Sequence, residues 1–277
     1  MICLGGILLE IIGGLMACLF YVAVKGFLGG GLKMRKLPKD LERNDGKVAL
    51  GVSERGVVYH NFLKYPHLII SGSTGYGKTN MIKVILEQIR GRVVLIDLKG
   101  GKDYGGRVSA VDISGARSVL EEVEMELKER MAGGGGSGER LYVVIDEAAE
   151  LLIPSYMSRK EGWEYLKCQE ICSEIARLGR SFGIHLIYCT QYPVSDVLPR
   201  QIKQNAEARI TFRLVTTKGS EVALDEPGAE QLPAGIPGRG IYKTDVVREF
   251  QAYLWDREDK NEIEVVEESR RHMYEIG

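Results

Sequence analysis

The sequence is poor in cysteine and has no cysteine spacing that could build a disulfide framework. Five cysteines stand in 277 residues, at positions 3, 18, 168, 172 and 189, and none forms a Cys-x-x-Cys pair. This usage is typical of a reducing compartment. Cys168 and Cys172 lie four residues apart on an expected helix, but no nearby histidine or third cysteine completes a metal ligand set. We interpret both as apolar residues on one helix face.

The sequence also lacks an excess of charge of either sign. Lysine and arginine number 37 against 38 aspartates and glutamates, a formal net charge of -1. The whole chain therefore carries no basic excess that would indicate a polyanionic partner, and any nucleic-acid surface has to be local. With 44% hydrophobic residues the chain can bury one substantial core, whereas a second full-sized domain would leave both cramped. We expect a single globular domain with attachments.

One long apolar run, at the N-terminus, predicts a membrane anchor over residues 1–24. Its only charged side chain is Glu10, and at about 1.5 Å per residue it can cross a hydrocarbon layer of about 30 Å. A signal peptide and a buried helix are the alternatives, and the first is disfavoured because no cationic segment precedes the run. Basic residues follow the run and none precedes it: Lys25, Lys33, Arg35, Lys36 and Lys39. The expected protein is a single-pass protein of the cell membrane with its remaining residues in the cytoplasm.

The rest of the chain divides into three parts by composition. Residues 25–45 are expected to form a basic flexible linker, loosest at Gly29-Gly30-Gly31. Residues 46–255 form the expected globular domain. Residues 256–277 are rich in charge and predict a surface tail.

Short apolar runs alternate with longer amphipathic segments within the globular domain. The expected strands are His67–Ser71, Val93–Asp97, Val108–Ile113, Leu141–Asp146, Ile184–Thr190 and Ile210–Val215. The expected helices are Thr79–Arg90, Ala116–Met131 and Gly162–Ser181, and a hairpin is expected from Lys47–Val52 and Gly56–Asn61. This alternation predicts an α/β fold with a largely parallel sheet and helices on both of its faces.

A glycine-rich segment follows the first of these core strands and leads directly into a helix. Its residues are Gly72, Ser73, Thr74, Gly75, Tyr76, Gly77, Lys78 and Thr79, which match GxxxxGK(S/T). Backbone N–H groups of such a loop curl around phosphate oxygens, and the helix N-terminus adds partial positive charge. Lys78 would reach the terminal phosphates, and the Thr79 hydroxyl would coordinate Mg²⁺. The segment predicts a P-loop that binds a nucleotide.

Two acids, Asp146 and Glu147, follow the apolar run that begins at Leu141. Strands of α/β proteins often end in acidic residues that cap a helix, so the pair alone is ambiguous. Beside a P-loop, Asp146 is expected to hold the Mg²⁺ shell and Glu147 to polarise the attacking water. The second acid favours an ATPase over a kinase or a GTPase.

Several other segments share the pattern of one family. They are the run ARLGRSFGIHLIYCTQ from Ala176 to Gln191, the segments Ile202–Asn205 and Ala208–Ile210, the segment Gly228–Leu232, and the earlier strand Leu95–Lys99. Together they resemble the FtsK/SpoIIIE DNA translocases of the FtsK/HerA superfamily, over about residues 67 to 243. The resemblance implies a RecA-like P-loop NTPase domain that uses ATP and Mg²⁺ and assembles into hexameric rings around double-stranded DNA.

The resemblance also implies roles for single residues. Gln191 would be the sensor of the γ-phosphate or of the attacking water. Arg180, three residues before Gly183, occupies the place of the arginine finger that completes the neighbouring subunit's site, with Arg177 as the alternative. For Arg209 two interpretations stay open, a second sensor and a residue that forms a surface ion pair. His185 is interpreted as a packing residue.

The chain departs from the family pattern in ways that leave alternatives open. It has one candidate membrane helix in place of several, no long linker and no winged-helix module, as in compact motors that transfer, segregate or package DNA of plasmids, integrative elements or phages. The main alternative is an FtsK-like ATPase of type VII protein secretion, although such proteins usually carry several motor domains and this chain has one P-loop. A nucleotide-gated membrane scaffold is the non-enzymatic alternative.

Overall fold

The structure is a computed structural model of the chain that describes residues 34–39, 46–134, 138–191 and 193–256. The expected membrane helix (residues 1–24), most of the expected linker and all but Asp256 of the expected tail lie outside the described residues. The chain divides into two units, residues 1–34 and residues 35–277, and the description below concerns the second. Within the described part of the chain, no helix has the length and hydropathy that a membrane crossing requires.

A ten-stranded sheet runs through the domain in the order β3-β2-β10-β9-β8-β4-β7-β6-β5, and β1 pairs with β10. Five neighbouring strands of this sheet are parallel. They are β8 (Ala208–Phe212), β4 (Leu68–Ser71), β7 (Ile184–Thr190), β6 (Leu141–Asp146) and β5 (Arg92–Asp97). All but β5 are buried along their whole length, which explains why they read as continuous apolar runs.

The other half of the sheet is antiparallel, so the expectation of a largely parallel sheet was wrong for this half. Its strands are β9 (Arg239–Lys243), β10 (Val247–Leu254), β2 (Lys47–Ser53) and β3 (Gly56–Asn61). The short β1 (Arg35–Lys36) lies beside β10 and is parallel to it. The predicted β2–β3 hairpin is confirmed. The β9–β10 hairpin was not predicted. It pairs β9 antiparallel to β8 and so ends the parallel run.

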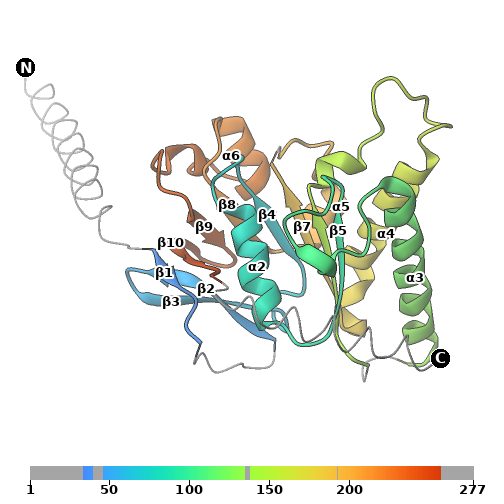
Figure 1. Cartoon of the computed structure of the whole chain (residues 1–277), viewed down its shortest axis with the longest axis horizontal. Helices are drawn as coiled ribbons and strands as arrows, with labels where there is room; N and C mark the ends of the chain where they lie inside the picture. Colours follow the sequence, from blue (N-terminus) through green and yellow to red (C-terminus); the bar gives the residue numbers. More distant parts are fainter. Residues whose placement is uncertain (1–33, 40–45, 135–137, 192, 257–277) are drawn as a thin grey trace, which may run out of the picture. The chain divides into compact units, whose positions relative to one another are not determined.

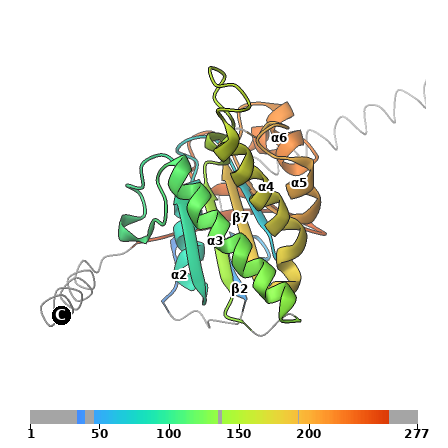
Figure 2. The ribbon, with the colours of Figure 1, turned by 90° about the vertical axis from the view of Figure 1, so that its right-hand side faces the viewer.

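Helices cover both faces of the sheet, as predicted (Figures 1 and 2). On one face, α2 (Lys78–Gln88) packs Met81, Ile82 and Ile85 into a core shared with β2 and β4. On the other face lie α3 (Ile113–Ala132) and α4 (Trp163–Leu178), and Cys168 and Cys172 of α4 are buried core residues there. The remaining short elements are α5 (Arg200–Asn205), α6 (Thr217–Leu224) and the 3-10 turns η1 (Gly105–Arg107), η2 (Ala148–Leu151), η3 (Gly179–Phe182) and η4 (Ala229–Gln231).

Two expected strands differ from the structure. The run from Val108 to Ile113 is not a strand, because only Ala110 bridges to β5 and α3 already begins at Ile113. The Asp112 side chain caps α3 by accepting a hydrogen bond from the Gly115 amide at 2.8 Å, which competes with extension of the run. The strand expected at Ile210–Val215 begins and ends earlier, at Ala208 and Phe212.

Candidate nucleotide-binding site

The P-loop connects the carboxyl end of β4 to the amino end of α2, as predicted. Gly72, Gly75 and Gly77 have φ values of 152°, 81° and 111°, a region that side-chain-bearing residues rarely adopt. A Cβ atom on Gly72 would also lie 2.6 Å from Cβ of Phe212 in β8. The loop is braced from β8, since the Ser73 amide donates to the Arg213 carbonyl at 2.9 Å. The sequence therefore builds a fixed backbone turn at the start of α2.

Lys78 is the first residue of α2, and its side chain folds back over the loop. Its ammonium group donates a hydrogen bond to the Gly72 carbonyl at 2.8 Å, and the residue is only 6% exposed. Burial lowers the pKa of Lys78, while the nearby Glu147 and Asp146 carboxylates act in the opposite direction. A nearly buried cation thus stands at the mouth of the turn, where phosphate oxygens would bind.

Asp146 and Glu147 stand at the carboxyl end of β6, two parallel strands from the P-loop strand. The Asp146 carboxylate accepts a hydrogen bond from the Tyr104 hydroxyl at 2.6 Å. Burial raises the pKa of Asp146, and the hydrogen bond from Tyr104 partly offsets this effect. Tyr104 itself is buried, and its pKa is raised by burial and by the neighbouring Asp146.

Glu147 is held by three groups from neighbouring strands and is 1% exposed. One carboxylate oxygen accepts from the Thr190 hydroxyl and the Gln191 amide, each at 3.0 Å. The other oxygen pairs with the Lys99 ammonium at 2.8 Å. The Glu147 backbone has φ 65°, a left-handed conformation that is uncommon for a non-glycine residue. The glutamate is therefore fixed by β5 and β7 as well as by its own strand.

Gln191 lies beside the P-loop at the end of β7. Its side-chain oxygen accepts a hydrogen bond from the Thr74 hydroxyl in the loop, and its backbone amide contacts Glu147. The residue thus links the loop to the acid, and its sensor role stays a prediction. The structure brings together Lys78, Asp146, Glu147 and Gln191, with Thr79 at the start of α2.

Arg180 does not belong to this cluster. It lies in η3, immediately before the amino end of β7, whereas the P-loop follows the carboxyl end of the parallel neighbour β4. The seven residues of β7 separate these two ends by about 20 Å. Arg180 cannot reach the P-loop of its own subunit. Arg177 is exposed on α4 and lies 3.8 Å from Glu174.

Arg209 and His185 make packing and ion-pair contacts among the described residues, away from the P-loop cluster. Arg209 of β8 is buried, pairs with Asp225 and also donates to the Lys203 carbonyl at 3.3 Å, so the structure favours the ion pair over a sensor. His185 stacks on Tyr142 with ring centroids 4.9 Å apart, and its Nδ1 lies 3.0 Å from the Pro66 carbonyl. The interpretation of His185 as a packing residue is confirmed.

Sequence reasoning missed the roles of Lys99 and Tyr104 at this site. Lys99 stood within the strand segment that matches the family, but its contact with Glu147 spans 48 positions. Strands β5 and β6 are parallel and pair Asp97 with Asp146, so residues just beyond both strands meet at one edge of the sheet. That register could have indicated the contact. No periodic signal marks Tyr104, which lies in the segment between β5 and η1.

The residues present fit a nucleoside triphosphate and a divalent cation. The left-handed glycine turn, the following helix and the buried Lys78 suit a triphosphate. The Thr79 hydroxyl and the Asp146 carboxylate are oxygen donors, the ligands that Mg²⁺ prefers. In the described residues no group of three or more His, Cys, Asp or Glu side chains could hold a metal ion by itself.

Comparisons with known proteins agree with this geometry. Residues 59–151 match the family described as the central domain of helicase HerA. The DNA translocase FtsK of Chlorobaculum tepidum is 32% identical over 226 residues, which cover 67% of this chain and 27% of that protein. The FtsK of Caldanaerobacter subterraneus is 29% identical over 72% of this chain and 31% of its own length. The chain therefore spans about a quarter to a third of the curated relatives it matches.

Solved structures share the fold. The conjugation coupling protein TcpA of pCW3, determined as a monomer with ATPγS, has a TM-score of 0.74 and 27% identity, and the match covers 80% of this chain and 70% of that chain. The cytoplasmic domain of the type VII secretion ATPase EccC of Thermomonospora curvata has a TM-score of 0.64 and 22% identity, over 82% of this chain and 30% of that one. The second likeness concerns the fold alone.

The sheet order and the P-loop with its paired acids define a P-loop ATPase domain. With the HerA match and the FtsK relatives, the domain is more narrowly an ATPase domain of the FtsK/SpoIIIE type, in the FtsK/HerA superfamily. The resemblance seen in the sequence is thereby confirmed.

Proposed function

We propose that the protein hydrolyses ATP to move double-stranded DNA, as a ring of identical subunits anchored in the cell membrane through residues 1–24. One observation supports the proposed ring. Lys78, Glu147 and Gln191 gather at one edge of the parallel strands, while Arg180 stands beyond the other edge. A site that needs an arginine finger can be completed only by a second copy. We propose DNA as the cargo because the curated relatives are named DNA translocases.

The groups of the site divide the chemistry among them. Lys78, which now donates to the Gly72 carbonyl, would turn to the terminal phosphate oxygens. Glu147 would orient and polarise the attacking water, and Gln191 would report the γ-phosphate to the P-loop through Thr74. Mg²⁺, held by Thr79 and Asp146, would neutralise charge on the β- and γ-phosphates. Arg180 of an adjacent copy would cover the charge that develops on the equatorial oxygens.

Glu147 in its ion pair with Lys99 is not free to accept a proton from water. The 2.8 Å contact fills one carboxylate oxygen, and Thr190 and the Gln191 amide fill the other. Turnover therefore requires a rearrangement of Lys99 or Gln191. Closure of the ring around DNA would supply it, and so DNA is expected to accelerate hydrolysis.

The test is the ATPase rate of the full chain in detergent or lipid nanodiscs, with and without duplex DNA. We expect duplex DNA to raise turnover several-fold, and heat-denatured DNA of the same length to act more weakly. Rings that form and hydrolyse ATP at one rate with or without DNA would contradict the DNA motor and favour a polypeptide cargo. A folded preparation that binds ATP without splitting it would favour the scaffold.

A further inference from the structure

The ion pair between Lys99 and Glu147 joins a partly exposed side chain to a buried one. The Lys99 ammonium lies 2.8 Å from a Glu147 carboxylate oxygen, and the two side chains are 40% and 2% exposed. A lysine side chain that already reaches solvent can turn its ammonium group into water at little cost, whereas a buried carboxylate cannot leave its site so easily. When this pair opens, Lys99 is therefore the partner that moves.

The other contacts of Glu147 do not depend on Lys99. The Thr190 hydroxyl and the Gln191 amide donate to the second carboxylate oxygen, each at 3.0 Å. Thr190 is the buried last residue of β7, and the Gln191 donor is a backbone group, so neither can swing away as a lysine side chain can. Without Lys99, Glu147 would stay hydrogen-bonded in place, and the side of the carboxylate that now faces the ammonium would be open to water.

Lys99 approaches Glu147 from the side of the sheet away from the P-loop. Strand β5, which precedes Lys99, lies three places from the P-loop strand β4 in the sheet order, about 14 Å at the usual strand spacing. Lys78 already stands at the mouth of the P-loop, where its ammonium donates to the Gly72 carbonyl. The position of Lys99 thus suits a partner of the acid better than a ligand of the phosphates.

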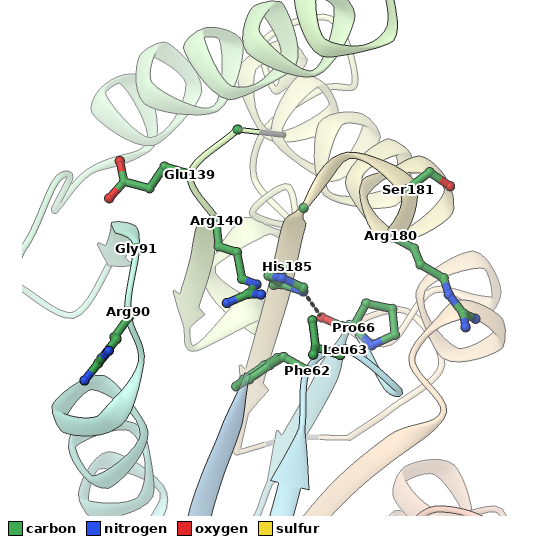
Figure 3. Close-up of a pocket in the computed structure, with 12 residues that line it drawn as sticks. Phe62, Leu63, Pro66, Arg90, Gly91, Glu139, Arg140, Arg180, Ser181 and His185 are labelled. Carbon is green, nitrogen blue, oxygen red and sulfur yellow. Dashed lines mark hydrogen bonds between the residues drawn. The ribbon is translucent and has the colours of Figure 1, made fainter. Parts of the chain in front are cut away.

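The arginines at the opposite end of the parallel strands cannot replace Lys99. A cavity of about 520 Å³ at that end is lined by Arg90, Arg140 and Arg180, and Figure 3 shows their guanidinium groups pointing apart. The seven residues of β7 separate that end from the edge that carries Glu147, by about 20 Å. A substitution of Lys99 therefore removes the ammonium group from Glu147 without a substitute from this cavity.

We propose that Lys99 is a positioning residue that keeps Glu147 from orienting the attacking water until their ion pair opens. The inference rests on the proposed function for the role of Glu147 and for duplex DNA as the trigger. An ammonium group at the carboxylate occupies lone pairs that would otherwise bind the water, so hydrolysis is slow while the pair is closed. The restraint belongs to a single subunit and does not require the ring.

The test compares ATP turnover of the full chain with and without duplex DNA. Lys99→Met removes the ammonium group and keeps a long, unbranched side chain. We expect it to raise turnover without DNA by about tenfold or more and to leave little further stimulation by DNA. Lys99→Arg keeps a cation at this position and is expected to restore the low turnover without DNA. Lys102→Met changes an exposed lysine of the same segment and is the matched control.

Two measurements show whether the gain acts through Glu147 in a folded protein. The double variant Lys99→Met with Glu147→Gln is expected to lose the gain, because the group that is released is no longer a carboxylate. Fluorescent-nucleotide binding checks that Lys99→Met keeps its P-loop, and Lys99→Gln takes its place if it does not bind. If neither variant binds nucleotide, Lys99 is needed to build the site and the proposal is wrong.

The remaining outcomes separate this proposal from the proposed function. Lower turnover of Lys99→Met with and without DNA would mean that the reaction needs Lys99, and unchanged turnover in both conditions would mean that the ion pair restrains nothing. Either result overturns the proposal and leaves a DNA-stimulated motor intact. If duplex DNA does not change wild-type turnover but Lys99→Met raises it, the restraint on Glu147 stands and the DNA motor fails.

Discussion

The two edges of the parallel strands differ in how their charged side chains are partnered. At the carboxyl edge, Lys78, Asp146 and Glu147 are all nearly buried, and each has a hydrogen-bonding partner within the chain. At the amino edge, Arg90 and Arg180 are exposed and have no acidic partner among the described residues. One edge satisfies its charges internally and the other presents them outward.

The difference indicates what each edge is for. Buried charges are tolerated in a folded protein only when they are paired or hydrogen-bonded. The charged groups of the carboxyl edge are therefore held in place by the chain itself before a nucleotide binds. Exposed arginines with no acid nearby cost little and are free to contact another molecule. In the proposed ring, the carboxyl edge of one subunit would face the amino edge of its neighbour.

The largest expected effects fall on the carboxyl edge. We predict that Lys78→Ala abolishes ATP binding and turnover, because the buried ammonium is the only lysine in the P-loop. Glu147→Gln is expected to lower turnover by about 10²-fold or more and to keep ATP binding. Fluorescent-nucleotide binding and steady-state phosphate release separate the two effects, with Lys128→Ala on α3 as a surface control. Equal loss of binding in both variants would break the assigned roles.

The next largest effect tests whether the amino edge acts between subunits. Arg180→Ala is expected to leave nucleotide binding unchanged and to lower turnover of the assembled ring by about 10³-fold. Arg177→Ala should change turnover little, since Arg177 is an exposed residue that pairs weakly with Glu174 at 3.8 Å. Turnover is measured against protein concentration beside light scattering. If Arg177→Ala instead abolishes turnover of the ring and Arg180→Ala does not, the finger has been assigned to the wrong arginine.

A third variant asks whether every arginine near the amino edge behaves alike. Arg209 is the second residue of β8, but it is buried and paired with Asp225, so its charge is compensated within the chain. Arg209→Met is expected to lower the free energy of unfolding by about 1–3 kcal/mol, with turnover per folded molecule unchanged. Chemical unfolding and an ATPase assay below the melting temperature measure the two quantities. Loss of turnover at unchanged stability would restore the sensor role.

The sequence predicted the carboxyl edge well because its signals are local. The P-loop is one contiguous segment, and Asp146 and Glu147 directly follow a buried strand, so spacing alone places them. Lys99 could not be placed in this way, because its contact with Glu147 depends on the parallel register of β5 and β6. The acid could be named from the sequence, but the group that restrains it could not.

The antiparallel half and the amino edge were also harder to predict. Strands β9 and β10 carry buried polar residues such as Arg239 and Gln251, so their hydrophobic pattern is weak. The cavity joins residues from Phe62 to His185, and nothing in their spacing marks them as neighbours. The run from Val108 to Ile113 shows the converse error, in which an apolar stretch loses to a helix cap at Asp112.

The smallest expected effect concerns three buried histidines, His60, His67 and His185. Burial lowers the pKa of His60 and of His67 to about 3, and that of His185 to about 4. Unfolded histidines have a pKa of about 6.5, so between pH 6.5 and 4 the unfolded chain binds more protons than the folded one. Stability is therefore lost as the pH falls through this window, by about 1.4 kcal/mol per pH unit for each histidine.

His67→Asn isolates one of these histidines with little change in packing. His67 Nδ1 accepts a hydrogen bond from the Leu186 amide at 3.0 Å, and the asparagine side-chain oxygen can accept the same bond without titrating. We expect the slope of unfolding free energy against pH to decrease by about 1.4 kcal/mol per pH unit between pH 6 and 4. Urea unfolding at a series of pH values measures it, and at pH 8 the wild type and the variant should show equal slopes. An unchanged acidic slope would mean that His67 is protonated in the folded protein, and that the interior behind the arginines carries charge after all.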